Sequence, residues 1–173
     1  MIRRLFILAA LLHAGCTPAL DWREVRLPGA GAVAAFPCKP SHESRRLLLV
    51  GRDVEMTLHA CTAAGTTWGL SHADVADPSK VGPALDALSA AVVNNVRAAA
   101  APNRTNEPFT VTGMTPNPHA VRLRAVGTRP DGSAVTVEAA VFAKGTRVFQ
   151  ASMVGGKPDA LSSQTFFASL RLP

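Results

Sequence analysis

The chain has 173 residues and a formal net charge of +6, with 47% hydrophobic and 17% charged residues. This length fits one domain with a short appendage and leaves little room for two hydrophobic cores. The composition excludes a disordered chain, a collagen and a coiled coil, and no apolar run approaches the ~20 residues of a membrane-spanning helix.

The first fifteen residues have the layout of a secretory signal. A basic start at residues 1–4 precedes an apolar run at 5–12, and small residues then lead to Cys16. Basic residues, a short apolar helix and a small-residue cleavage site are the features of a signal peptide. We therefore expect residues 1–15 to be removed and the mature chain to lie outside the cytosol.

The end of this leader, His13-Ala14-Gly15-Cys16, resembles the bacterial lipobox, in which the cysteine is acylated and becomes the mature N-terminus. His13 departs from that pattern, which usually has an aliphatic residue there. The resemblance implies palmitate-type acyl chains on Cys16, each contributing about 0.8 kcal/mol of membrane affinity per buried methylene. Thr17 in place of Asp favours the outer over the inner membrane. Ordinary signal-peptidase cleavage and soluble secretion are the alternative.

Cys38 and Cys61 remain as a pair if Cys16 carries lipid. In an oxidising compartment such a pair is most simply a structural disulfide. Closing a loop of about 24 residues would stabilise the fold by roughly 3 kcal/mol through chain entropy. The alternative is a zinc site, because His42 and His59 would complete four ligands. Neither the Cys38 and His42 pair nor the His59 and Cys61 pair has the CxxC spacing that is typical of a zinc site. We therefore favour the disulfide and expect no metal or cofactor.

The first half of the mature chain alternates strand and turn signals. Residues 16–28 are expected to be a lipid-anchored tether, and residues 29–173 a single domain. Short apolar runs and two-residue alternation predict half-buried strands. We expect these strands at residues 31–36, 45–50, 54–61 and 67–73.

One long helix is expected next. Asp77-Pro78 is a typical helix start, and apolar residues then recur at spacings of three and four along one face. An alanine run ends this helix before Pro102. Residues 103–108 are expected to be a polar loop, and residues 109–112 a short strand.

The last third predicts an antiparallel meander closed by a helix. Alternating apolar residues separated by two tight turns predict strands at 121–127, 135–141 and 148–154. A short helix over 158–170 would cover the sheet. The expected fold class is therefore α+β, with an antiparallel sheet flanked by helices.

Three sequence segments and the order of the predicted elements resemble those of a known family. The segments are AAFPCKP at 34–40, VFAKGTRVFQASMVG at 141–155 and FFASLRL at 166–172. Over residues 22–173 the chain is similar to the PsbP-like α/β sandwich, in particular to bacterial lipoproteins of the DcrB and LpqN type. The resemblance implies a binding or assembly accessory of the cell envelope.

Motifs for catalysis are scarce. The sequence GLSHA at 69–73 lacks the second glycine of a nucleophile elbow. Ser71, His72 and Asp74 lie too close along a strand to form a triad, since neighbouring side chains face opposite ways. An enzyme would require Ser71, His72 or His119 to be grouped with a carboxylate in a pocket, and we do not expect it.

Basic residues of the meander suggest a surface for anions. Arg122 and Arg124 share a strand face, and Arg147 is expected to join them through Glu138. One hypothesis is that these arginines bind lipid headgroups, lipopolysaccharide phosphates or an acidic partner. The alternative, which we favour, is a solvated sheet face with cross-strand ion pairs. Nucleic acid is disfavoured by the compartment and by the scarcity of aromatic residues.

The functional prediction is a non-catalytic lipoprotein of the bacterial cell envelope. Its lipid anchor at Cys16 would hold it on a membrane facing the periplasm, where it would act as a binding or assembly accessory for an envelope protein. The alternative is a periplasmic carrier with a pocket for a small amphiphilic or lipid ligand between the sheet and the long helix. Trp68, Met56 and Phe142 could line such a pocket, although a place in the core is commoner for such residues.

Overall fold

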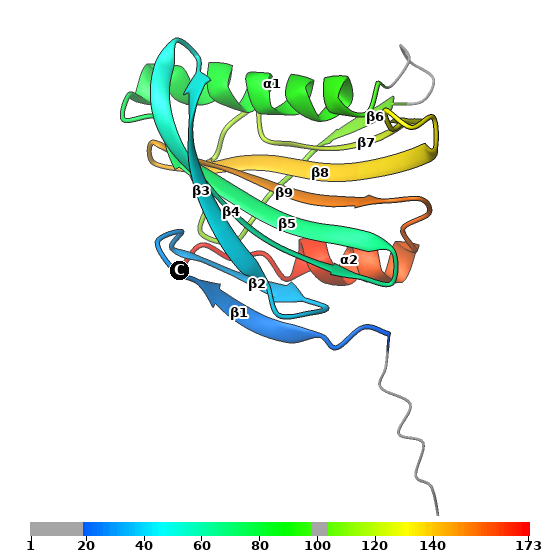
Figure 1. Ribbon diagram of the computed structural model, residues 1–173. Coiled ribbons are helices and arrows are strands. Elements are labelled where there is room, and N and C mark those ends of the chain that lie inside the picture. Colours follow the sequence, from blue (N-terminus) through cyan, green and yellow to red (C-terminus); the bar gives the residue numbers. More distant parts are fainter. Residues whose placement is uncertain (1–18, 98–103) are drawn as a thin grey trace, which may run out of the picture.

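The computed structural model describes residues 19–97 and 104–173 (Figure 1). The expected signal peptide at 1–15, the lipidation site Cys16 and the alanine run before Pro102 lie outside the described residues. Within these two ranges no helix is both long and apolar enough to cross a membrane.

A seven-stranded antiparallel sheet forms the centre of the α+β fold, in the strand order β3-β4-β5-β9-β8-β7-β6. Helix α1 covers one face of this sheet, and α2 with the separate β1-β2 hairpin covers the other (Figure 1). We call these the α1 face and the hairpin face. The elements are β1 (Arg23–Leu27), β2 (Ala32–Phe36), β3 (Ser41–Leu49), β4 (Arg52–Ala63), β5 (Thr66–Asp74), α1 (Pro78–Asn95), β6 (Arg104–Pro108), β7 (Val121–Thr128), β8 (Ala134–Lys144), β9 (Arg147–Gly155) and α2 (Ala160–Ala168).

Most of the predicted elements are confirmed. Strands β7, β8 and β9 form the expected meander, with Arg124 opposite Glu138 and Phe142 opposite Phe149. The long helix, the hairpin of β4 and β5, and the C-terminal helix also lie where the sequence predicts them. Strand β8 is buried on both sides, because α1 covers one face of the sheet and α2 with the β1-β2 hairpin covers the other.

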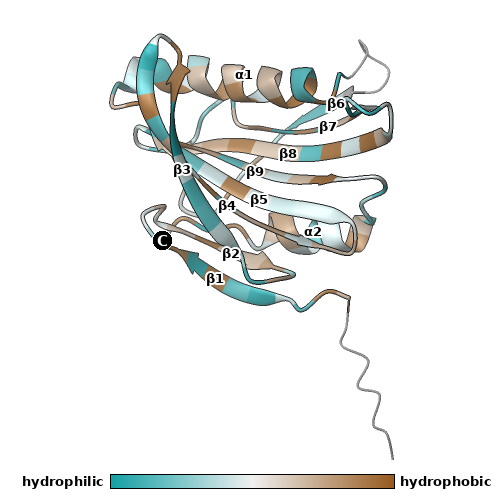
Figure 2. Cartoon of the chain, in the orientation of Figure 1, coloured by the Kyte–Doolittle hydropathy of each residue, from teal (hydrophilic) through white to brown (hydrophobic). Residues whose placement is uncertain are grey.

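Four local predictions are wrong, and each concerns a polar strand or its neighbour. Residues 23–27, expected in the tether, form β1 and pair with β2. Residues 104–108, expected in a polar loop, form the edge strand β6, while residues 109–112 are not a strand. Strand β3 begins at Ser41, before the apolar run. An edge strand exposes much of its surface to solvent, so it needs no apolar alternation, and Figure 2 shows β1 and β3 largely in hydrophilic colours.

The α1 face is covered obliquely. The N-terminal half of α1 packs on apolar residues of β3, β4, β5, β8 and β9, whereas its C-terminal half packs mainly on β7 and β8. Asp77 caps the start of the helix by accepting a hydrogen bond of 2.9 Å from the N–H of Ser79. At the other end, the N–H of Thr128 donates to the carbonyl of Val96 at 2.9 Å, which holds the end of α1 beside the end of β7.

The hairpin face is closed by an aromatic core. Trp68, Phe36 and Phe166 are almost completely buried there, and the rings of Phe142 and Phe149 stack with their centroids 5.2 Å apart. Trp68 and Phe142, considered above as pocket residues, therefore belong to this core. Met56 packs against the cluster on the opposite face.

Cys38 and Cys61 form the predicted disulfide, with their Cα atoms 6.0 Å apart. The bond joins the segment after β2 to β4, and so fastens the β1-β2 hairpin to the large sheet. Both thiols of the zinc alternative are consumed in this bond. Among the described residues no group of histidine, cysteine and carboxylate side chains could hold a metal ion.

Replacing both Cys38 and Cys61 by serine is expected to lower the free energy of unfolding by about 3 kcal/mol, because the unfolded chain loses its cross-link. Denaturant titration of the oxidised protein and the double variant measures this difference. The reduced wild-type protein is the control and should match the variant. Equal stability of the oxidised protein and the variant would contradict the prediction.

Candidate functional site

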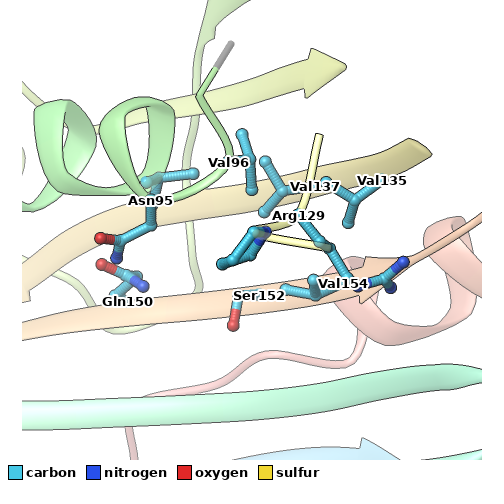
Figure 3. A pocket seen from close by; sticks show the side chains of 10 residues that line it. Asn95, Val96, Arg129, Val135, Val137, Gln150, Ser152 and Val154 are labelled. Atoms are coloured by element: carbon cyan, nitrogen blue, oxygen red, sulfur yellow. The ribbon is translucent and has the colours of Figure 1, made fainter. Parts of the chain in front are cut away.

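A pocket opens on the α1 face beside the C-terminal end of α1 (Figure 3). Its volume is about 210 Å³. Half of the lining residues are valines, so the walls are mostly apolar, with a few polar groups among them, as in typical small-molecule sites. The lining residues are Val92, Asn95, Val96, Arg129, Pro130, Val135, Val137, Gln150, Ser152 and Val154.

The pocket exists because α1 departs from β9 toward its C-terminal end. Val148, at the start of β9, is buried in the cluster under the first half of the helix. Farther along the same strand and face, Gln150 and Ser152 are only partly buried. The bond from Thr128 to the carbonyl of Val96 holds the helix end over β7 instead. The far end of β9 is thus left without a helix above it.

Three uncharged polar side chains of the pocket form no hydrogen bond with other described residues. These are the amides of Asn95 and Gln150 and the hydroxyl of Ser152. In Figure 3 the amides of Asn95 and Gln150 lie near each other on one side of the pocket. Because amide and hydroxyl groups can both donate and accept, they are available to a polar group of a ligand.

The guanidinium of Arg129 is held at the pocket by its own turn. Its Nη1 donates to the carbonyl of Ala134 at 3.2 Å and to the hydroxyl of Ser133 at 3.4 Å. None of the ion pairs within the described ranges involves Arg129. A positive charge at the rim of an apolar pocket therefore retains free N–H donors.

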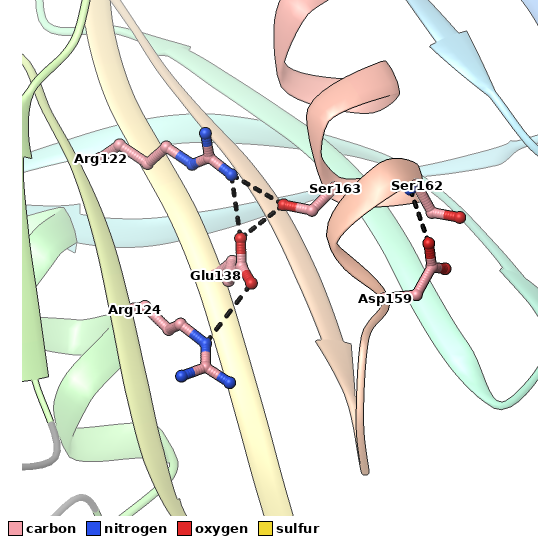
Figure 4. Close-up of polar contacts among 6 residues, drawn as sticks. All are labelled: Arg122, Arg124, Glu138, Asp159, Ser162 and Ser163. Carbon is pink, nitrogen blue, oxygen red and sulfur yellow. Dashed lines mark hydrogen bonds and ion pairs between the residues drawn. The ribbon is translucent and has the colours of Figure 1, made fainter.

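Arg122 and Arg124 share one carboxylate on the hairpin face (Figure 4). The Arg122 Nη2 donates to Glu138 Oε2 at 3.0 Å and to the hydroxyl of Ser163 at 2.7 Å, and Arg124 Nε lies 3.5 Å from Glu138 Oε1. The guanidinium of Arg122 also lies 4.4 Å from the centre of the Phe167 ring. This cluster joins the meander to α2 and contains the predicted cross-strand ion pair.

Arg147 is not brought to this cluster. It lies at the end of the meander, opposite Lys144, whereas Glu138 lies in the middle of β8; the Nη1 of Arg147 donates to the carbonyl of Ala30 at 2.9 Å. The bond connects β9 to the turn of the β1-β2 hairpin. The three arginines thus occupy two places on the hairpin face, and binding of an anion by any of them stays a prediction.

A row of three histidines crosses β3, β4 and β5 on the hairpin face. The ring centroids of His42 and His59 are 5.5 Å apart, and those of His59 and His72 are 5.9 Å apart. Burial and the neighbouring His42 lower the pKa of His59. Burial, His59 and Arg147 lower the pKa of His72 to about 4. The Nε2 atoms of His59 and His72 are buried without a hydrogen-bond partner among the described residues.

Sequence reasoning missed this row, because it considered His42 and His59 only as metal ligands. The other candidate residues for catalysis are dispersed. Ser71 faces the α1 side and donates to the carbonyl of Gln150 at 3.4 Å, whereas its neighbour His72 faces the hairpin side. His119 lies at the surface, with its Nδ1 2.9 Å from Asp86 of α1.

Replacing Glu138 by glutamine is expected to lower the free energy of unfolding by about 2 kcal/mol, because two arginines would lose a carboxylate that is only 13% exposed. Thermal or denaturant unfolding measures the loss. Glu43→Gln, on the exposed strand β3, is the matched control and should change stability little. Equal effects of the two substitutions would contradict a structural role for the Glu138 cluster.

The histidine row predicts a loss of stability in acid. The pKa of His72 is lowered from 6.5 to about 4, so the unfolded chain binds a proton more readily than the folded one. The free energy of unfolding therefore keeps its full value above pH 6.5 and decreases as the pH falls toward 4. Because His72 is partly exposed, we expect this decrease to be about 2 kcal/mol. His72→Gln should remove this part of the pH dependence in denaturant titrations, whereas His119→Gln should not. Parallel curves for wild type and His72→Gln would contradict the assignment.

Comparison of the chain with protein-family models, with curated proteins and with solved structures finds no match. The function of the chain therefore has to be inferred from its own residues.

Proposed function

We propose that the chain is a non-catalytic, lipid-anchored binding protein of the bacterial cell envelope, with a PsbP-like α/β sandwich fold. A leader that ends in Cys16 supports export and acylation. The bond between Cys38 and Cys61 fits an oxidising compartment such as the periplasm. The α+β arrangement, with a helix on each face of an antiparallel sheet, agrees with the proposed family.

The pocket beside α1 is the observation that carries the binding function. Its walls combine valines with the unpaired amides of Asn95 and Gln150, and this combination suits a ligand with an apolar part and a polar part. Covering apolar surface yields about 25 cal/mol per Å², and the amides can orient the polar part. Between the two binding roles expected from the sequence, this pocket favours a carrier of a small amphiphile.

Accessory binding to an envelope protein is the second candidate. Strand β3 lies at an edge of the sheet, so one side of its backbone is open to pairing with another chain. Leu48 on this strand is 71% exposed on the hairpin face, so it adds one apolar side chain to the open edge.

The carrier role predicts that protein purified from envelopes retains a small amphiphile. Asn95→Trp would place an indole at the pocket and should reduce the retained fraction severalfold in native mass spectrometry. The matched control is Asn94→Trp, an adjacent exposed position that does not line the pocket. Equal retention by the two variants, or no retained amphiphile in the wild type, would contradict the carrier role, and a dominant crosslinked protein would then favour the accessory role.

A further inference from the structure

We propose that the pocket beside α1 selects an anionic amphiphile with a single alkyl chain, whose chain lies among the valines and whose head group binds Arg129. This inference rests on the proposed carrier function, because it names the ligand class of the same pocket.

The valines of the pocket are shielded from water. Val92 and Val96 of α1 and Val135 and Val137 of β8 are each at most 7% exposed, so they form the floor of a recess. A volume of about 210 Å³ is smaller than the ~300–1,000 Å³ of sites for drug-sized ligands. The recess therefore has room for one alkyl chain, and a lipid with two acyl chains would leave the second chain in water.

The charge of the pocket comes from one residue. Arg129 is the only charged residue among those that line the described pocket. The bonds from its Nη1 to Ser133 and Ala134 fix the guanidinium in place, and a guanidinium has five N–H donors in all. Hydrogen bonds from the hydroxyl and the N–H of Ser133, and to a smaller extent the charge of Arg129, lower the pKa of Asp131 in the same turn. That carboxylate accepts its hydrogen bonds from Ser133, at 2.9 Å and 2.7 Å, so Arg129 is left for an external anion.

The neutral polar groups lie apart from the charge: in Figure 3 the amides of Asn95 and Gln150 are on the opposite side of the pocket from the guanidinium of Arg129. Arg129 therefore binds the anionic head, and the amides and the hydroxyl of Ser152 can hydrogen-bond a second polar group of the ligand. Hydrogen bonds from a charged donor to an anion are roughly twice as strong as neutral ones. A cationic head would meet the positive charge of Arg129 without any carboxylate among the lining residues, so the site discriminates by sign of charge.

Calorimetric titration of the exported chain carrying Cys16→Ser tests this selection, since no covalent acyl chain then competes for the pocket. The probes are decanoate, decyl phosphate, decanol and decyltrimethylammonium, all below their micelle concentrations. We expect both anions to bind about tenfold more tightly than decanol, and the cation to bind most weakly. The ranking of decanoate against decyl phosphate identifies a carboxylate or a phosphate head.

Arg129→Gln is expected to weaken decanoate binding about tenfold and to leave decanol binding unchanged. Arg129→Lys should restore most of the preference for anions because it restores the charge. The matched control is Arg46→Gln, which removes an exposed positive charge from β3, outside the pocket, and should change neither affinity.

Three outcomes of these titrations would each contradict a different part of the two proposals. Equal affinity for anion, alcohol and cation, all blocked by Asn95→Trp, would overturn the selection by Arg129 and leave the carrier function standing. Absence of binding for all four probes would overturn both proposals. Decanoate binding that persists in Asn95→Trp would place the amphiphile elsewhere and would overturn the assignment to this pocket.

Discussion

The apolar packing of α1 on the sheet sets the direction of this helix. Its first half lies over β3, β4, β5, β8 and β9, whereas Val92 and Val96 of its second half pack on β7 and β8. The hydrogen bond from the N–H of Thr128 to the carbonyl of Val96 fastens the end of the helix beside the end of β7. One helix cannot cover a seven-stranded sheet, so an oblique helix leaves part of the α1 face open. The pocket, its valine floor and the unpaired amides of Asn95 and Gln150 all follow from this tilt.

The other face of the sheet is closed by several independent bonds. The disulfide joins the hairpin segment to β4, Arg147 joins β9 to the hairpin turn, and the Arg122–Glu138–Ser163 contacts join the meander to α2. The described chain begins beside this face, away from α1 (Figure 1).

The parts of the fold that sequence reasoning predicts are those with strong local signals. The alternation of β8 and β9, the helical spacing of Val81 to Val96 and the pairing of two cysteines all follow from the chain itself. Polar edge strands such as β6 carry no apolar period, and so they resemble loops. The histidine row and the position of Arg147 depend on strand register, and the pocket depends on the tilt of a helix. These properties are set by tertiary packing, which local patterns do not encode.

Diffraction from crystals pressurised with xenon tests most directly whether an open apolar recess lies beside the end of α1, because xenon enters such cavities. We expect a bound xenon atom between Val92 of the helix and Val137 of β8, within reach of Val154 on β9. An unoccupied site, with α1 resting on β9 and with Gln150 and Ser152 buried beneath it, would contradict the account.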